Sequence, residues 1–464
     1  MIPDDCLLEI FSFYVQVEAE DVNAWHTLVH VCQSWRNVVF ASPLRLNLRL
    51  LCTNRRPVKE MLDIWPTTLP IIIRYNSGAL FPAKGADNII AALEHRDRVC
   101  EIALWGVSSS LWERFAAMTR EPFLALTSLL LGSNNEWAPT IPDPFLAGSA
   151  PRLQRLWLAN TSFPALRKLL MSTSDLVHLD LLNIPHSAYI SPETMVTCLA
   201  GMAGIETLNL KFLSSRSRPD PMREHPPVLT RTVLPALTLL GFQGAGEYLE
   251  DFVAQINTPL LITLSVTFLG LVLRIPQLCR FIGCAEKLKP SNRATVGFYA
   301  AIVCFKFVPS SGFELAIKCD NLPGQVSSMA AVCRELSPLL THVERLDLGC
   351  LALRTVWNHI MDPTQWQELF YPFIAVRSLH VSKKLGPLIA PALRALTGSR
   401  VTEVLPRLLY LFYEGFQPSS PVHEATKPFV TARQQSSDCL PVAVLRWVRE
   451  VDMYSEFGDW DVDD

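Results

Sequence analysis

The chain has 464 residues, of which 49% are apolar and 18% are charged. Soluble domains carry about 25% charged residues and disordered chains are poor in apolar ones, so this composition excludes a largely disordered protein. The chain has a net charge of −3, whereas nucleic-acid-binding domains usually carry an excess of basic residues. We therefore expect a folded chain without a nucleic acid partner.

Several features argue against a secreted or membrane protein. The most membrane-like stretch, residues 260–273, is shorter than the roughly 20 apolar residues that a spanning helix needs. No Lys or Arg precedes Arg36, so no secretory signal is expected. The 12 cysteines are scattered without a C-x-x-C pair, which favours reduced thiols over zinc ligands or disulfides. The sequence thus predicts a protein of the cytoplasm or nucleus that has no membrane partner, metal or cofactor.

The first 50 residues predict two short amphipathic helices. Pro3 suits the first turn of a helix, and the acidic residues that follow suit its positive end. Asp21 or Asn23 is expected to cap a second helix that ends at Pro43. The apolar side chains at helical spacing are Leu7, Leu8, Ile10, Phe11 and Tyr14, then Trp25, Leu28, Cys32, Trp35 and Val39. Two short helices cannot bury this much apolar surface against each other, so part of it should face another protein.

The same segment resembles the F-box. That family opens with Leu-Pro-x-Glu and apolar pairs and closes with Val-Cys-x-x-Trp, which here are Ile2-Pro3-Asp4-Asp5 and Val31-Cys32-Gln33-Ser34-Trp35. Ile2 replaces the usual Leu, and Asp5 replaces the usual Glu. Through residues 24–32, 390–393 and 401–406 the whole chain is similar to the large family of F-box proteins of mushroom-forming fungi.

The resemblance implies that residues 1–47 are an F-box that docks on the Skp-type adaptor of SCF ubiquitin ligases, and through it on a cullin scaffold. The residues at the matching contact positions are Pro3, Leu7, Leu8, Ile10, Phe11, Leu28, Val31, Cys32 and Trp35. Such docking would insert aliphatic and aromatic anchors into a groove of the partner. The alternative is that side chains such as Leu28 and Trp35 only hold the helices together.

Residues 99–415 predict a repeat array. A six-residue pattern, apolar-x-x-apolar-x-apolar, starts at residues 99, 126, 153, 176, 205, 237, 261, 343 and 376. Leucine-rich repeats have this strand signature and a period of about 20–29 residues. Their Asn occurs in phase only as Asn134, whereas Asn160 and Asn183 fall one residue early. The expected fold is α/β: an irregular leucine-rich-repeat solenoid with parallel strands on its concave face and helices on its convex face.

The flanks and the gap in the array are less regular. Residues 48–98 are expected to connect the F-box to the array, with a degenerate repeat at residues 69–74. Residues 267–342 predict an irregular part with strands at 294–298, 303–307 and 313–319. Residues 416–464 predict a C-terminal extension that ends in an acidic tail, because seven of the last 15 residues are Asp or Glu.

Alternation along the strands predicts a target-binding surface. Side chains between the core leucines should point away from the helices. They are Trp105, Arg155, Trp157, His178, Asp180, Asn209, Arg345, Asp347 and His380. Trp157 beside Arg155 is typical of an interaction hot spot. The alternative for Trp157 is that a neighbouring loop covers it.

Catalytic and metal sites find little support in the sequence. The G-x-S-x-G, H-E-x-x-H and P-loop motifs are missing. His26 and His30 lie one helical turn apart, but a solvated helix face explains them more simply than a metal does. The sequence therefore predicts a non-catalytic substrate-recognition subunit of a ubiquitin ligase. A non-degradative interaction scaffold and an enzyme built on a repeat scaffold stay open as alternatives.

Overall fold

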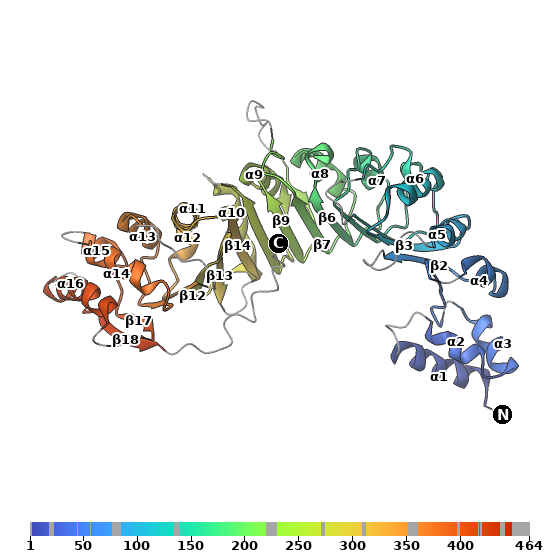
Figure 1. Ribbon diagram of the computed structural model, residues 1–464, viewed down its shortest axis with the longest axis horizontal. Helices are drawn as coiled ribbons and strands as arrows, with labels where there is room; N and C mark the ends of the chain where they lie inside the picture. The colour runs from blue at the N-terminus through green and yellow to red at the C-terminus, as the bar shows by residue number, and fades with distance from the viewer. Residues whose placement is uncertain are drawn as a thin grey trace. The chain divides into compact units, whose positions relative to one another are not determined.

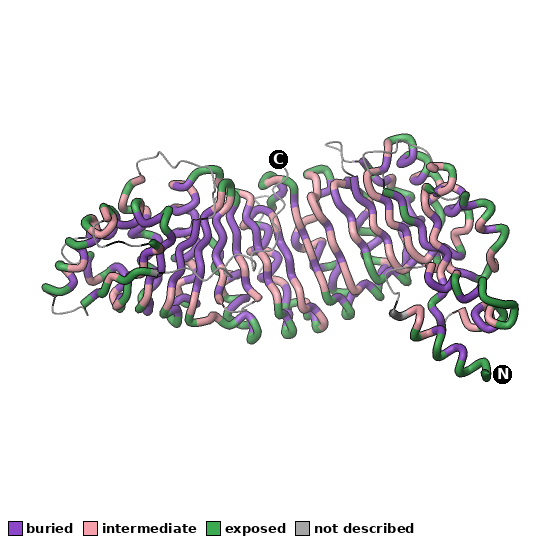
Figure 2. The backbone as a smooth tube through the Cα atoms, turned by 60° about the horizontal axis from the view of Figure 1, so that its bottom comes forward, coloured by how far each residue is buried: buried purple, intermediate pink, exposed green. Residues whose placement is uncertain are grey.

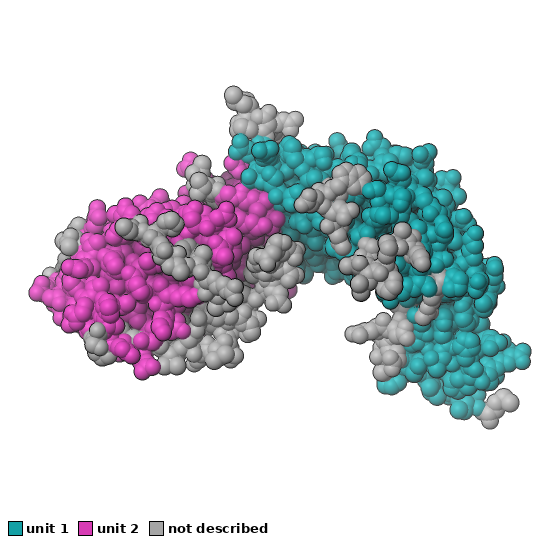
Figure 3. Space-filling view, in the orientation of Figure 1, with its two compact units in different colours: residues 1–240, 255–259 teal, residues 241–254, 260–464 magenta. Residues whose placement is uncertain are grey.

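The computed structural model describes residues 2–447 except 18–22, 44, 56, 77–84, 134–138, 220–229, 271–273, 309–311, 351–360, 397–399, 416, 418–419 and 437–440. The chain forms two compact units (Figure 3). Unit 1 comprises residues 1–240 and 255–259, and unit 2 comprises residues 241–254 and 260–464. Asp21, Asn134 and the acidic tail lie outside the described residues.

Unit 1 begins with three short helices, α1 (Asp4–Val17), α2 (Ala24–Val29) and α3 (Gln33–Ala41) (Figure 1). The expected second helix is therefore two helices, with Asn23 at the N-cap position of α2. The chain leaves helical geometry at Cys32, whose backbone is extended and whose Sγ accepts a hydrogen bond from the Trp35 N–H at 3.4 Å. Cys32 thus caps α3, where the sequence suggested an interior position of one continuous helix.

The three helices share a core with the first repeat. Leu7, Leu8 and Phe11 of α1 pack in one cluster with Trp25 of α2 and with Leu69, far along the chain. The Trp25 indole donates its N–H to the Arg49 carbonyl at 3.0 Å, and its ring lies 5.1 Å from that of Trp65. The packing is therefore continuous across residue 47, where the sequence suggested a domain boundary.

The rest of unit 1 is a regular parallel array. Its strands are β1 (Leu50–Thr53), β2 (Ile71–Asn76), β3 (Val99–Trp105), β4 (Ser128–Gly132), β5 (Arg155–Ala159), β6 (His178–Ile184) and β7 (Thr207–Phe212), paired in chain order. Between them run α4 (Val58–Ile64), α5 (Ala86–Leu93), α6 (Ser109–Met118), α7 (Leu166–Met171) and α8 (Pro192–Leu199), which cover one face of the sheet (Figure 1). The 3-10 turns Phe145–Gly148 and His186–Ala188 complete the return segments. The strands begin at Leu50 with β1, and the degenerate repeat expected at residues 69–74 corresponds to β2.

The core leucines explain this register. Leu129, Leu156, Leu179 and Leu208 are direct neighbours on successive strands, and all are fully buried. All nine predicted six-residue cores overlap strands. Asn160 and Asn183 both have a φ of 51°, the left-handed region that Asn tolerates best after Gly. The Asn160 side chain also donates to the Ser133 carbonyl at 3.0 Å, which links neighbouring repeats.

Unit 2 continues the strand-and-helix pattern around one irregular insertion. Its elements are β9 (Leu239–Gly244), which starts in unit 1, α9 (Gly246–Gln255), β11 (Thr263–Leu269), α10 (Pro276–Cys284), the 3-10 turn Glu286–Leu288, β12 (Arg293–Phe298), β13 (Ile302–Val308), β14 (Phe313–Lys318), α11 (Leu322–Glu335), α12 (Ser337–Leu340), β15 (Arg345–Cys350), α13 (Pro363–Phe370), β16 (Ser378–Val381), α14 (Gly386–Arg394), α15 (Arg400–Glu403), β17 (Tyr410–Glu414), α16 (Pro421–Gln435) and β18 (Ala443–Trp447). A short pair, β8 (Thr232–Val233) and β10 (Ile256–Asn257), belongs to unit 1.

The insertion is an antiparallel meander of β12, β13 and β14. Its spatial order is reversed: β14 pairs with β11, β13 lies between β14 and β12, and β12 pairs with β15. α11 packs on β13 and β14 and carries the chain from β14 to β15. The three predicted strands of the irregular part are therefore correct, although their order did not follow from the sequence.

The sheet of each unit has a helix-covered face and an opposite face, which we call the open face. On β5, Leu156 and Leu158 are buried toward the helices, whereas Arg155 and Trp157 lie on the open face. Figure 2 shows that this alternation weakens along unit 2, where successive residues of β15 are buried. The membrane-like stretch contributes residues 263–269 to β11, so this part of it is a strand. Within the described ranges, no helix has the length and hydropathy needed to cross a bilayer.

Candidate interaction surfaces

The structure divides the nine predicted adaptor contacts into an interior and an exposed group. Leu7, Leu8, Phe11 and Leu28 are buried and hold the three helices together. Trp35 is half-buried, with its ring 4.7 Å from that of Phe11. The exposed group comprises Pro3, Ile10, Val31 and Cys32. The expectation that all nine side chains face a partner needs correction, because four of them lie in the interior.

A second apolar stripe runs along the outer face of α1. Cys6, Ile10 and Phe13 follow one another at spacings of four and three residues, which places them on one side of the helix. Ile10 is 53% exposed and Phe13 is 70% exposed. Sequence reasoning missed Cys6 and Phe13, although their spacing from Ile10 carried the signal. α1 thus presents apolar side chains both to its own core and to solvent.

The two histidines at metal-ligand spacing have different surroundings. His30 is exposed, whereas the His26 ring packs 4.8 Å from the ring of Trp65. Throughout the described ranges, no three His, Cys, Asp or Glu side chains converge as metal ligands would. Burial raises the pKa of the Cys52 thiol to about 12 and also raises that of Cys304, the opposite of what a nucleophilic cysteine needs.

On the open face of unit 1, two tryptophans meet across a glycine. Trp105 at the end of β3 and Trp157 on β5 have ring centroids 5.0 Å apart, although β4 separates their strands. Gly132 on β4 makes this possible, because a Cβ there would lie 2.1 Å from the Trp105 ring and 2.9 Å from the Trp157 ring. Trp157 is therefore half-buried, and it is the Trp105 ring that packs against it.

Substituting Gly132 with alanine should separate this pair. We expect Gly132→Ala to destabilise unit 1 by about 1–3 kcal/mol through overpacking and to change the near-UV circular dichroism of the coupled indoles. Gly204→Ala is the matched control, since a Cβ at Gly204 meets nothing within 4 Å. Identical spectra and unfolding midpoints for both variants would show that the two rings do not depend on Gly132.

The tryptophan pair borders a hollow of about 560 Å³. On the side of β3–β5 it is lined by Ala103, Trp105, Leu130 and Trp157, and on the side of β1 and β2 by Thr53, Asn54, Arg55, Arg74 and Asn76. The Arg74 guanidinium donates two hydrogen bonds of 3.2 Å to one oxygen of Glu101. One side of the hollow is thus apolar, and the other side offers hydrogen-bond donors.

The other predicted residues of unit 1 continue the open face beyond the hollow. Arg155 is exposed on β5 and stands beside His178 on β6. Trp157 stands beside Asp180, whose carboxylate accepts a 2.6 Å hydrogen bond from Asn209 on β7. The structure therefore brings together all six of the predicted surface residues that lie on β3–β7.

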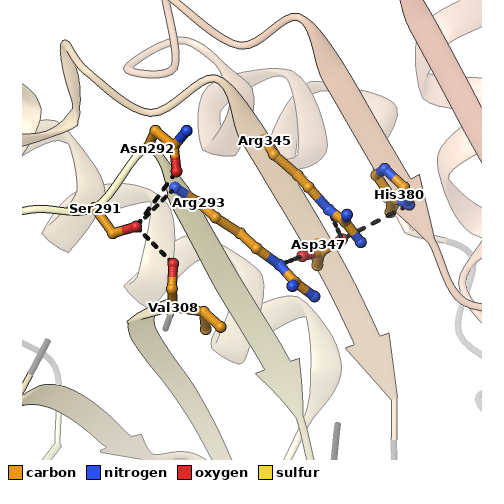
Figure 4. A network of polar contacts seen from close by, with 7 residues as sticks. All are labelled: Ser291, Asn292, Arg293, Val308, Arg345, Asp347 and His380. Carbon is orange, nitrogen blue, oxygen red and sulfur yellow. Dashed lines mark hydrogen bonds and ion pairs between the residues drawn. The ribbon is translucent and has the colours of Figure 1, made fainter. Parts of the chain in front are cut away.

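In unit 2 the predicted surface residues form a buried polar network (Figure 4). Asp347 accepts hydrogen bonds from Arg293 at 2.5 Å and from Arg345 at 3.0 Å, and His380 approaches it to 3.8 Å. The Asp347 side chain is only 1% exposed, and His380 is also buried. The expectation that Asp347 and His380 face solvent is therefore wrong. Sequence reasoning missed Arg293, because it reaches Asp347 only through the pairing of β12 with β15.

The environment of His380 keeps its imidazole neutral. Burial lowers the pKa of His380 to about 4; Asp347 opposes this shift, and the nearby arginines, Arg345 and Arg293, add to it. Its ring stacks on Phe412 with centroids 4.3 Å apart. The approach of His380 to Asp347 is consequently not an ion pair at neutral pH.

This lowered pKa predicts an acid-sensitive unit 2. Between pH about 6.5 and about 4 the unfolded chain binds a proton at His380 and the folded chain does not. The unfolding free energy should therefore fall as the pH drops through this window. Above the window, the protonation of His380 should no longer affect it. We would measure urea midpoints against pH for the natural chain and for His380→Gln, which should show a smaller loss. Parallel pH profiles would contradict the assignment.

Comparison with known proteins finds similarity to solved structures but to no described family. No family model and no curated protein matches the chain. Among solved structures, the crystal structure of the leucine-rich repeat-containing protein LegL7 from Legionella pneumophila is similar at 15% identity. The match covers 68% of this chain and 93% of that one, with a TM-score of 0.25. We base the assignment of a leucine-rich-repeat-type α/β fold on the ladder of parallel strands, helical return segments and in-register leucines described above.

Proposed function

We propose that this chain is the substrate-recognition subunit of an SCF-type ubiquitin ligase. In this role the N-terminal helices bind a Skp-type adaptor, and through it a cullin scaffold, while the open face of the repeats binds a target protein. The chain itself performs no bond chemistry and needs no cofactor. It acts in the cytoplasm or nucleus by raising the effective concentration of target lysines near the ubiquitin-carrying enzyme.

The exposed apolar stripe of α1 supports this proposal most directly. A helix whose inner face already fills a core would ordinarily place polar residues on its outer face, yet Ile10 and Phe13 lie there. Exposed apolar side chains at helical spacing are suited to a groove on a partner. The stripe lies in the segment that resembles the F-box, and that resemblance implies that the partner is the Skp-type adaptor.

The proposal is tested by reconstitution with the whole chain. We expect residues 1–464, mixed with purified Skp-type adaptor at micromolar concentration, to elute as a stable complex in size-exclusion chromatography. Deleting residues 1–47 is a poor control, because it would remove the packing partners of Trp65 and Leu69. Point substitutions on the stripe are the better comparison. Failure of the intact chain to bind would leave a repeat protein that assembles other complexes.

A further inference from the structure

The hollow on unit 1 has a polar and an apolar side, which restricts what can fill it. The indoles of Trp105 and Trp157 offer a flat apolar surface on the β3–β5 side. Arg74, Asn54 and Asn76 offer guanidinium and amide donors on the β1–β2 side. A ligand that satisfies both sides must carry an apolar group and a hydrogen-bond acceptor close together.

The charges around the hollow indicate that the acceptor is an anion. The open-face positions of β1–β6 carry two acidic residues, Glu101, which pairs with Arg74, and Asp180, which lies beside Trp157. Three arginines outnumber them: Arg74 and Arg155 on the strands and Arg55 after β1. None of the described residues that line the hollow is acidic. Because Glu101 also holds the Arg74 guanidinium in place, a carboxylate can meet a preorganised donor there.

The size and setting of the hollow favour a peptide over a small molecule. Its volume of about 560 Å³ lies within the roughly 300–1,000 Å³ of ligand sites. It opens on the sheet face, however, and that face continues through Arg155 and Asp180 with no helix of the described residues above it (Figure 1). An extended segment can fill the hollow and follow this face, whereas a small ligand would stay largely in water.

We propose that this hollow binds a segment of the target protein in which an apolar or aromatic side chain stands next to Asp or Glu. The apolar side chain packs against Trp157 and Trp105, and the neighbouring carboxylate accepts hydrogen bonds from Arg74. The inference rests on the proposed function, since it specifies the chemistry of the target that the repeat array recognises.

Selection from a random-peptide phage library tests the proposal on the immobilised full chain. The natural chain should enrich peptides that place Leu, Phe, Tyr or Trp next to Asp or Glu. The best synthetic peptide should bind at least tenfold more weakly to Trp157→Ala and to Arg74→Gln. Selection on Arg74→Glu should replace the acidic residue of the consensus with Lys or Arg, a change that loss of folding cannot produce.

Arg114→Glu is the matched control. Arg114 on α6 is 46% exposed and pairs with Asp87, much as Arg74 is 47% exposed and pairs with Glu101, but it lies on a helix away from the hollow. This variant should keep the consensus and the affinity of the natural chain. No enrichment, a consensus without the acidic residue, or equal binding by the Trp157 and Arg74 variants would overturn the inference. Adaptor binding is measured separately, so failure here is distinguishable from failure of the proposed function.

Discussion

Replacing Asp347 with alanine should destabilise unit 2 by about 2–4 kcal/mol, because two arginines would lose the carboxylate that compensates them. Asp347 is almost completely buried, whereas the Arg293 and Arg345 side chains are 25% and 35% exposed, so water recovers part of their charge. The loss should concentrate in β12, β15 and β16, the strands that the network joins. Amide hydrogen exchange measures it strand by strand, which suits a repeat array that opens locally.

Two controls separate lost compensation from lost packing. The triple variant Arg293→Met/Asp347→Leu/Arg345→Met removes all three charges and should stay close to natural stability, as replaced buried ion networks often do. Glu344→Ala removes an exposed partner of Arg377 at 3.8 Å and should cost only about 0.2–1 kcal/mol. If Asp347→Ala exchanged no faster than Glu344→Ala, the network would contribute nothing specific to unit 2.

The repeat array was largely predictable, because burial imposes a local pattern on each strand. Leu156, Leu179 and Leu208 occupy the same place in successive repeats and are buried against the same layer of helices. The apolar pattern of each repeat is therefore enough to predict its own strand. The meander was predicted only as three strands, since the reversed order of β12, β13 and β14 depends on pairings between segments distant in sequence.

The surfaces were harder to predict, because they depend on register between distant segments. Asp347 accepts a hydrogen bond from Arg293, 54 positions earlier, and no local motif indicates that pairing. The tryptophan pair beside the hollow depends on Gly132, whose role appears only once Trp105 and Trp157 are neighbours. At the N-terminus, the apolar spacing from Leu28 to Trp35 fits one helix as well as two, so periodicity concealed the break at Cys32.

Ile10→Glu should weaken adaptor binding by about 2–4 kcal/mol, the range of an interface hot spot, without changing thermal unfolding. Ile10 is 53% exposed, so a glutamate there stays hydrated in the free protein and is desolvated only when the partner binds. Leu8→Ala should instead lower the stability of the helices. Leu8 is buried, and truncating its side chain should cost about 2–5 kcal/mol of unfolding free energy. Two measurements on the same preparations distinguish these effects. Isothermal titration calorimetry gives the affinity for the adaptor, and thermal unfolding gives the stability.

If the stripe on α1 is the docking surface, substitutions at two of its positions should weaken adaptor binding alike. Phe13→Glu should behave like Ile10→Glu, because Phe13 lies on the same side of α1 and is 70% exposed. Leu124→Glu is the matched control, since Leu124 is also a largely exposed apolar side chain but lies between α6 and β4. If both α1 variants bound the adaptor as tightly as Leu124→Glu, the outer face of α1 would not be the docking surface. The resemblance to the F-box would then describe how the helices pack and not what they bind.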